Sequence, residues 1–229
     1  MSSDWLLVVH LFYEPGRKPA TNTVIDWLFD RGCRTEEGGG NETCHYYVDG
    51  MDWPESNVPT ERALAELTEN AGYLRLWSDG VRFDFEDWEQ YAHVPDLPYY
   101  TFSVPEAQLV PVESVEEGRK KAQRIVDLVA DFADETGAVY GFGRTAAGDH
   151  QSHCQDADDL CDGDIDRIFW FNYLSELIAS RIGRERLLTA PAEHVEERRG
   201  GAVLVVPYLN PRQRDRRTRR ATIEDHLGI

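Results

Sequence analysis

The sequence predicts a single α+β domain with a mixed, mostly antiparallel sheet and helices packed on one side. Strand patterns occur in clusters, helical patterns separate them at irregular intervals, and Asp79-Gly80 joins two alternating apolar stretches in the manner of a β-hairpin. No Gly-rich phosphate loop follows the first strand pattern, which speaks against a doubly wound nucleotide-binding fold. No repeat or linker divides the chain, so we expect residues 1–210 to form one domain and residues 211–229 an Arg-rich C-terminal tail.

The N-terminal third alternates strand and helix patterns. Residues 4–13 are rich in β-branched and aromatic side chains with little alternation, which is typical of a strand at the centre of a sheet. A short helix should follow, because Thr21, Asn22 and Thr23 are good N-cap residues and Gly32 is a suitable end. Further elements are then expected as a strand over 44–48, a helix after Thr60, and the hairpin over 72–88.

The clearest element is a helix over residues 115–136. Ser114 and Glu117 form a capping box directly before apolar residues that recur with the helical period. Gly137 occupies the position after the last helical turn, where a left-handed residue commonly ends a helix. This helix should pack its apolar stripe on the sheet.

Strand patterns lie on both sides of this helix in the sequence. Residues 99–110 read as a strand, and Pro105 should place part of it at a sheet edge because proline has no N–H to donate. Gly141 and Gly143 allow close backbone approach in a strand over 138–143, but the third glycine of a dinucleotide-binding loop is missing. Further strands are expected over 168–174 and 202–206, with a short helix over 176–182 that Gly183 ends.

Charge dominates the composition of the chain. There are 42 acidic and 24 basic residues in 229, for a formal net charge of -18, and Lys18, Lys120 and Lys121 are the only lysines. An acidic, lysine-poor composition looks haloarchaeal, because molar salt screens self-repulsion that would otherwise push the chain apart. The same charge argues against a general nucleic-acid-binding surface.

The compartment is expected to be the cytoplasm. The apolar run near the N-terminus has neither a basic segment before it nor a cleavage site after it, so no signal peptide is predicted. No stretch approaches 18 consecutive apolar residues, so no membrane partner is expected. Four cysteines in a chain of this length do not form a disulfide framework of the secreted kind.

An arginine run interrupts the acidic composition near the C-terminus. Six arginines fall between residues 212 and 220. Such a run can bind nucleic acid or an acidic partner through bidentate contacts, or it can lie across the acidic surface of its own chain. A nucleic-acid-associated protein is therefore one alternative function.

The acidic loop over residues 149–166 carries the candidate metal ligands His150, His153, Cys154 and Cys161. Imidazole and thiolate groups suit zinc in tetrahedral geometry, and a metal-dependent hydrolase built around this loop is a second alternative function. The spacing of the four residues matches no standard zinc pattern. A salt-adapted surface loop with free thiols and solvated histidines is the competing interpretation.

Two stretches of the C-terminal half carry a family resemblance. The string Trp170-Phe-Asn-Tyr-Leu-Ser175 precedes a short helix, and Gly200-Gly-Ala-Val-Leu-Val205 follows it. This order resembles small α+β immunity proteins of bacterial polymorphic-toxin systems. The resemblance implies a non-catalytic protein that binds and occludes a toxin-like protein partner, with an acidic face steering it toward a basic partner. It assigns no catalytic residues and no cofactor.

Overall fold

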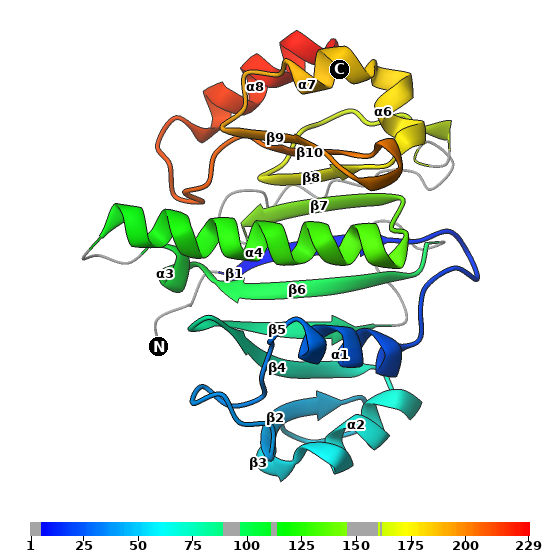
Figure 1. Cartoon of the computed structure of the whole chain (residues 1–229), viewed down its shortest axis with the longest axis vertical. Helices are drawn as coiled ribbons and strands as arrows, with labels where there is room; N and C mark the ends of the chain where they lie inside the picture. Colours follow the sequence, from blue (N-terminus) through cyan, green and yellow to red (C-terminus); the bar gives the residue numbers. More distant parts are fainter. Residues whose placement is uncertain (1–5, 89–96, 111–113, 146–159, 161) are drawn as a thin grey trace.

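A computed structural model describes residues 6–88, 97–110, 114–145, 160 and 162–229 of the chain (Figure 1). Its centre is one ten-stranded sheet in the order β3-β2-β4-β5-β6-β1-β7-β8-β10-β9, and every neighbouring pair is antiparallel. The strands are β1 (Leu6–Phe12), β2 (Thr43–Val48), β3 (Glu55–Pro59), β4 (Gly72–Ser78), β5 (Val81–Asp87), β6 (Tyr99–Pro105), β7 (Tyr140–Thr145), β8 (Phe171–Leu174), β9 (His194–Glu197) and β10 (Val203–Val206).

The helices lie on both faces of this sheet, so the predicted packing on one side alone is wrong, and the described strand pairs are all antiparallel rather than mixed. On one face, α4 crosses in front of β1, β6 and β7, and α1 lies over the β4–β5 region (Figure 1). The buried residues of these helices belong to one apolar core, and those of the three C-terminal helices belong to a second core. The first group is α1 (Thr21–Asp30), α2 (Thr60–Glu69), α3 (Glu106–Leu109) and α4 (Val115–Thr136); the second is α6 (Glu176–Ile182), α7 (Arg184–Leu188) and α8 (Arg216–Leu227).

The α+β class and the packing of α4 on the sheet are confirmed. Ser114 Oγ accepts a hydrogen bond from the Glu117 N–H at 3.2 Å, and Gly137 ends α4 in the left-handed conformation with φ 71°. Val126 and Val129 are fully buried between the helix and the sheet. Burial of a side chain of this size stabilises a fold by about 1.5–3 kcal/mol, so the apolar stripe accounts for the position of α4.

Two glycines of β7 let neighbouring side chains cross this strand at short range. A Cβ on Gly141 would stand 2.5 Å from Leu11 Cδ2. A Cβ on Gly143 would stand 2.8 Å from Phe171 Cβ. The predicted close approach is therefore confirmed, and these glycines serve the contact of β7 with β1 and β8.

The edge position predicted from Pro105 is wrong. Strand β6 lies inside the sheet between β5 and β1. Pro105 is tolerated there because it is the last residue of the strand and immediately precedes α3, whose first residue is Glu106. The missing N–H therefore falls where the ladder ends, and residues 106–109 form a helical turn rather than a continuation of the strand.

Several elements add to those that the sequence predicts. The strands β3 and β9 close the two ends of the sheet. Within the segment 211–229, residues Arg216–Leu227 form α8, and Ile223 and Leu227 are buried in the second core. Because α6, α7 and α8 cover only the half of the sheet around β8 and β10, the corresponding face of the other half is not part of either core. No helix in the described ranges has the length and apolar composition that a membrane crossing requires.

Candidate functional site

The outward side chains of β2, β4 and β5 form a partly exposed surface that we call the open face. Buried and partly exposed residues alternate along all three strands. The buried positions, such as Tyr46, Leu74 and Phe83, enter the first core. The alternate positions point to the other side of the sheet, as strand geometry requires. The open face consists of His45, Tyr47, Tyr73, Arg75, Trp77, Arg82, Asp84 and Glu86.

Two cross-strand pairs occupy the centre of the open face. Arg75 lies opposite Asp84, and its Nε and Nη2 donate to the two carboxylate oxygens at 2.8 and 3.0 Å. Trp77 lies opposite Arg82 in the next outward pair. The Arg82 guanidinium makes no hydrogen bond or ion pair within the part of the chain that the structure describes. The charges of Arg75 and Asp84 thus neutralise each other, whereas the second pair presents the Trp77 indole beside the Arg82 guanidinium, which is unpaired among the described residues.

A hydrogen-bonded aromatic group continues the open face onto β2. His45 contacts Ser56 Oγ through Nδ1 at 2.6 Å and the Tyr73 hydroxyl through Nε2 at 3.1 Å. The Tyr47 and Tyr73 rings stack with their centroids 6.0 Å apart. Burial, followed by the nearby charge of Arg75, lowers the pKa of His45. The imidazole is therefore held neutral at neutral pH, where it orients Tyr73 instead of carrying charge.

A pocket of about 390 Å³ opens between this surface and the loop that precedes β2. Arg34 reaches the end of β4 through two backbone hydrogen bonds with Trp77, at 2.9 and 2.7 Å, and so places the following residues beside the strand. Glu36 accepts hydrogen bonds from the Thr43 N–H and hydroxyl at 2.7 and 3.0 Å, which lower its pKa. The pocket is lined by Thr35, Glu36, Glu37, Thr43, Cys44, His45, Ser56, Asn57, Arg75, Trp77 and Arg82.

A polar row extends from the open face toward the sheet centre and becomes buried at Ser103, Thr101 and His10. Glu86 accepts hydrogen bonds from Trp88 Nε1 at 2.8 Å and from Ser103 Oγ. Desolvation raises the pKa of Glu86 even though both hydrogen bonds oppose the shift. One row further, His10 Nδ1 and Thr101 Oγ1 are 2.9 Å apart. These contacts fix the side chains that border the open face on β6 and β1.

The residue types of the open face are those of a binding surface. Tyrosine, tryptophan and arginine are enriched in the centres of protein interfaces, because they bury large areas with little loss of conformational freedom and offer polar contacts at one end. Lysine, which interfaces avoid, does not occur on the open face. Here Trp77 and Arg82 supply such groups next to a pocket, and the Arg75–Asp84 pair holds the surface in place.

The metal site predicted in the acidic loop is not tested by the structure. His150, His153, Cys154 and Cys161 all lie outside the described residues, and zinc binding there stays a prediction. Within the described ranges, no group of three or more His, Cys, Asp and Glu side chains could hold a metal ion. Cys33 and Cys44 are buried free thiols, and desolvation raises the pKa of each to about 11. Neither is a reactive thiolate at neutral pH.

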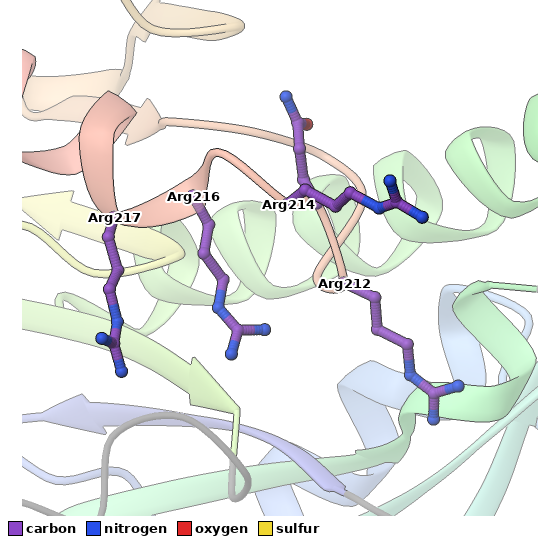
Figure 2. Close-up of a pocket in the computed structure, with 5 residues that line it drawn as sticks. Arg212, Arg214, Arg216 and Arg217 are labelled. Atoms are coloured by element: carbon purple, nitrogen blue, oxygen red, sulfur yellow. The ribbon is translucent and has the colours of Figure 1, made fainter.

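The arginine run forms part of a second hollow, which we call the Arg hollow. It has a volume of about 410 Å³ and is lined by Arg212, Gln213, Arg214, Arg216 and Arg217. Figure 2 shows Arg212, Arg216 and Arg217 extending to the same side of the segment between β10 and α8. The sequence singled out these arginines. It did not single out the open face, although the outward positions of the hairpin over 72–88 already read Tyr, Arg, Trp, Arg and Asp.

The fold has a counterpart among solved structures. The chain matches a Pseudomonas aeruginosa T6SS protein, PA0821, with a TM-score of 0.55 and 12% sequence identity, over 98% of this chain and 76% of the other. At this level of identity the match shows a shared fold. No family model matches the sequence, and no curated protein matches it either.

Proposed function

We propose that this chain is a non-catalytic, immunity-like module that binds a toxin-like partner protein through the open face and occludes the partner's site. The observation that carries the proposal is the open face itself. One half of the sheet is covered on both sides by helices, whereas the outward side chains of β2, β4 and β5 belong to neither core. A surface of tyrosine, tryptophan and arginine around a pocket is typical of a protein-binding site.

Two likenesses support the same function. The strings at 170–175 and 200–205 resemble the immunity proteins of polymorphic-toxin systems. The structural counterpart is a T6SS protein, which is compatible with a secretion-system-associated role.

The chemistry of the open face constrains the partner. The chain has a net charge of -18, so a basic protein would be attracted over a distance set by the salt concentration. At contact, Trp77 and Tyr47 offer aromatic area, and Arg82 needs a carboxylate or carbonyl oxygen. The partner is therefore a basic protein whose contact patch combines apolar side chains with at least one acceptor for Arg82.

In this function the residues of the open face hold the partner protein in place and keep its substrate away, and none of them takes part in a chemical reaction. The Arg75–Asp84 ion pair and the His45–Tyr73 hydrogen bond hold the surface rigid before the partner arrives, which reduces the entropy lost on binding. The bound sheet face then covers the partner's active surface and keeps its substrate away. Neutralisation follows from steric occlusion alone.

A comparison of three purified forms tests the proposal. Wild type, Trp77→Ala and Leu177→Ala are immobilised and exposed to native lysate in molar KCl, and the retained proteins are identified by mass spectrometry. Leu177 lies on α6, on the covered half of the molecule, and is 55% exposed, so it controls for loss of an exposed apolar side chain. A candidate partner is then purified, titrated with each form, and assayed for loss of its own activity on binding.

The expected result is one basic protein that binds wild type and Leu177→Ala equally, binds Trp77→Ala at least about tenfold more weakly, and is inactive in the complex. A purified partner that binds all three forms equally would place the interface elsewhere. A partner that stays fully active in a saturated complex would refute occlusion.

A further inference from the structure

The Arg hollow concentrates positive charge, and in the described part of the chain only one of its four arginines pairs with a carboxylate. Four of its five lining residues are arginines, and none is acidic. Arginines elsewhere in the described ranges mostly pair with carboxylates, as Arg31 does with Asp131 and Arg184 with Glu197. The arginines of the hollow do not follow this pattern, although the chain has a net charge of -18. Their mutual repulsion would be relieved by a bound anion.

One arginine of the hollow has a structural role. Arg212 Nε donates to Glu106 Oε2 at 3.0 Å, and the Glu106 side chain is only 2% exposed. This ion pair attaches the segment after β10 to the start of α3, on the other helical layer. The ion pair thereby fixes the backbone segment that carries Arg214, Arg216 and Arg217.

The other three arginines have little or nothing to bind in the described part of the chain. Arg214 and Arg217 make no hydrogen bond or ion pair there, and both are exposed. Arg216 Nη1 reaches the Pro211 carbonyl oxygen at a distance of 3.4 Å, which is a weak contact. Arg216 and Arg217 extend in the same direction as Arg212 in Figure 2, whereas Arg214 extends sideways from the same segment. All four side chains line the same hollow, so the donors that are unpaired in the described part of the chain are available to one ligand.

The start of α8 adds to the positive potential at the same place. Arg216 is the first residue of this twelve-residue helix, and its first turn contains no acidic residue. The side chain of Asp215, which could have capped the helix, instead accepts a hydrogen bond from Arg219 Nε at 3.0 Å. Helix N-termini favour negative charge, whereas here arginines occupy the first turn. An anion in the hollow would offset the repulsion among the arginines and the repulsion between the arginines and the positive end of the helix.

We propose that the Arg hollow binds a small oligophosphate, meaning an anion with two or more linked phosphate groups. Guanidinium groups bind phosphate oxygens in pairs, and three available arginines exceed the donors that one phosphate group needs. A volume of about 410 Å³ also exceeds the size of a single phosphate. A long nucleic acid fits less well, because all the lining residues come from one short segment and the chain as a whole repels a polyanion.

Tripolyphosphate is the probe for this proposal. Calorimetric titration at about 0.3 M KCl compares wild type with Arg214→Gln/Arg217→Gln and with Arg199→Gln/Arg62→Gln. The control pair removes the same charge from two exposed arginines that bind carboxylates outside the hollow. A third form, Arg214→Lys/Arg217→Lys, keeps the charge but loses the paired donor geometry. Circular dichroism confirms that each form is folded under these conditions.

We expect tripolyphosphate to bind wild type and the Arg199/Arg62 control equally. The glutamine pair should bind at least about tenfold more weakly and the lysine pair at an intermediate level, because guanidinium pairs with phosphate through two bonds. The ligand should raise the melting temperature of wild type and not that of the glutamine pair. Equal binding by wild type and the glutamine pair, or no binding by wild type, would overturn the proposal.

A parallel titration with a 20-nucleotide single strand separates the two sources of phosphate. We expect it to bind more weakly than tripolyphosphate. Tighter binding of the strand that also depends on Arg214 and Arg217 would overturn the assignment to a small ligand and favour a nucleic-acid site instead. Neither result depends on whether a partner protein binds the open face.

Discussion

Trp77 of β4 lies directly opposite Arg82 of β5, and the Arg82 guanidinium forms no ion pair in the described part of the chain. The adjacent outward pair, Arg75 and Asp84, forms a bidentate ion pair on the same hairpin. Within this hairpin, Arg75 and Asp84 therefore hold the shape of the open face, whereas Trp77 and Arg82 are available to a partner.

Replacement of Arg82 by alanine should weaken partner binding by at least about tenfold, because an arginine that becomes buried at an interface is a frequent hot spot. Its effect on the free energy of unfolding should stay within about 0.5 kcal/mol, since the guanidinium has no partner among the described residues. Arg75→Ala should instead lower stability as well, because it leaves Asp84 unpaired. Isothermal titration and urea unfolding measure the two effects. A loss of stability in Arg82→Ala as large as that in Arg75→Ala would contradict this division of roles between the two arginines.

Arg198→Ala should destabilise the fold by about 2–3 kcal/mol. The Arg198 side chain is 10% exposed and donates to Asp134 at 2.9 Å and to Asp131 at 2.6 Å, which ties the end of β9 to α4. Its removal leaves Asp134, which is also only 10% exposed, without its cation. The neighbouring Arg199 pairs with Glu135 at the surface, so Arg199→Ala should change stability by no more than about 0.5 kcal/mol. Equal unfolding midpoints in urea for the two variants would show that the buried network does not stabilise the fold.

Glu86→Gln should gain stability relative to wild type as the pH rises from about 4 to about 7. Desolvation raises the pKa of Glu86 in the folded state. The contribution of Glu86 to the stability of wild type is therefore most favourable below the pKa of the unfolded chain and is lost as the pH rises through the pKa of the folded state. The glutamine variant has no such loss. Glu66→Gln is the matched control of opposite sign. Hydrogen bonds from Tyr46 and Arg62 lower the pKa of Glu66, so that variant should lose stability relative to wild type over the same range. Thermal unfolding at several pH values measures both differences, and a flat difference for Glu86→Gln would show that its carboxyl is not desolvated.

Lowering KCl from about 3 M to about 0.1 M should lower the midpoint of thermal unfolding. The net charge of -18 repels itself more strongly in the folded state when less salt screens it. Sucrose at the same osmolality is the control, because it favours the compact state without screening charge. An unchanged midpoint at low salt would rule out salt adaptation as the reason for the acidic composition.

The parts of the fold that could be predicted are those with dense local signals. For α4 the capping box, the continuous apolar stripe and Gly137 all agree, and the hairpin over 72–88 has strict alternation around Asp79-Gly80. The edge strands β3 and β9 could not be predicted in this way. Only Val58 of β3 is buried, and no residue of β9 is, so neither strand has an apolar period to read.

The helix α8 shows the same limit. Ile223 and Leu227 are its only buried residues, and arginines dominate its first turns, so the composition predicted a tail rather than a helix. The arginines of the Arg hollow could be recognised from the sequence, because they are close together in it. The pocket of the open face could not, because it requires Arg34 to bond to Trp77 across more than forty residues of chain, and that contact leaves no local pattern.

Hydroxyl-radical footprinting of the complex with the purified partner tests most directly whether the open face is the binding site. Oxidation of Trp77, Tyr73 and Tyr47 is measured in the free and bound chain, with the exposed Leu177 of α6 and Leu188 of α7 as references. We predict that the three aromatic side chains become protected at saturation while both leucines are labelled as before. Unchanged labelling of Trp77, with protection at α6 and α7 instead, would contradict the open face as the docking surface.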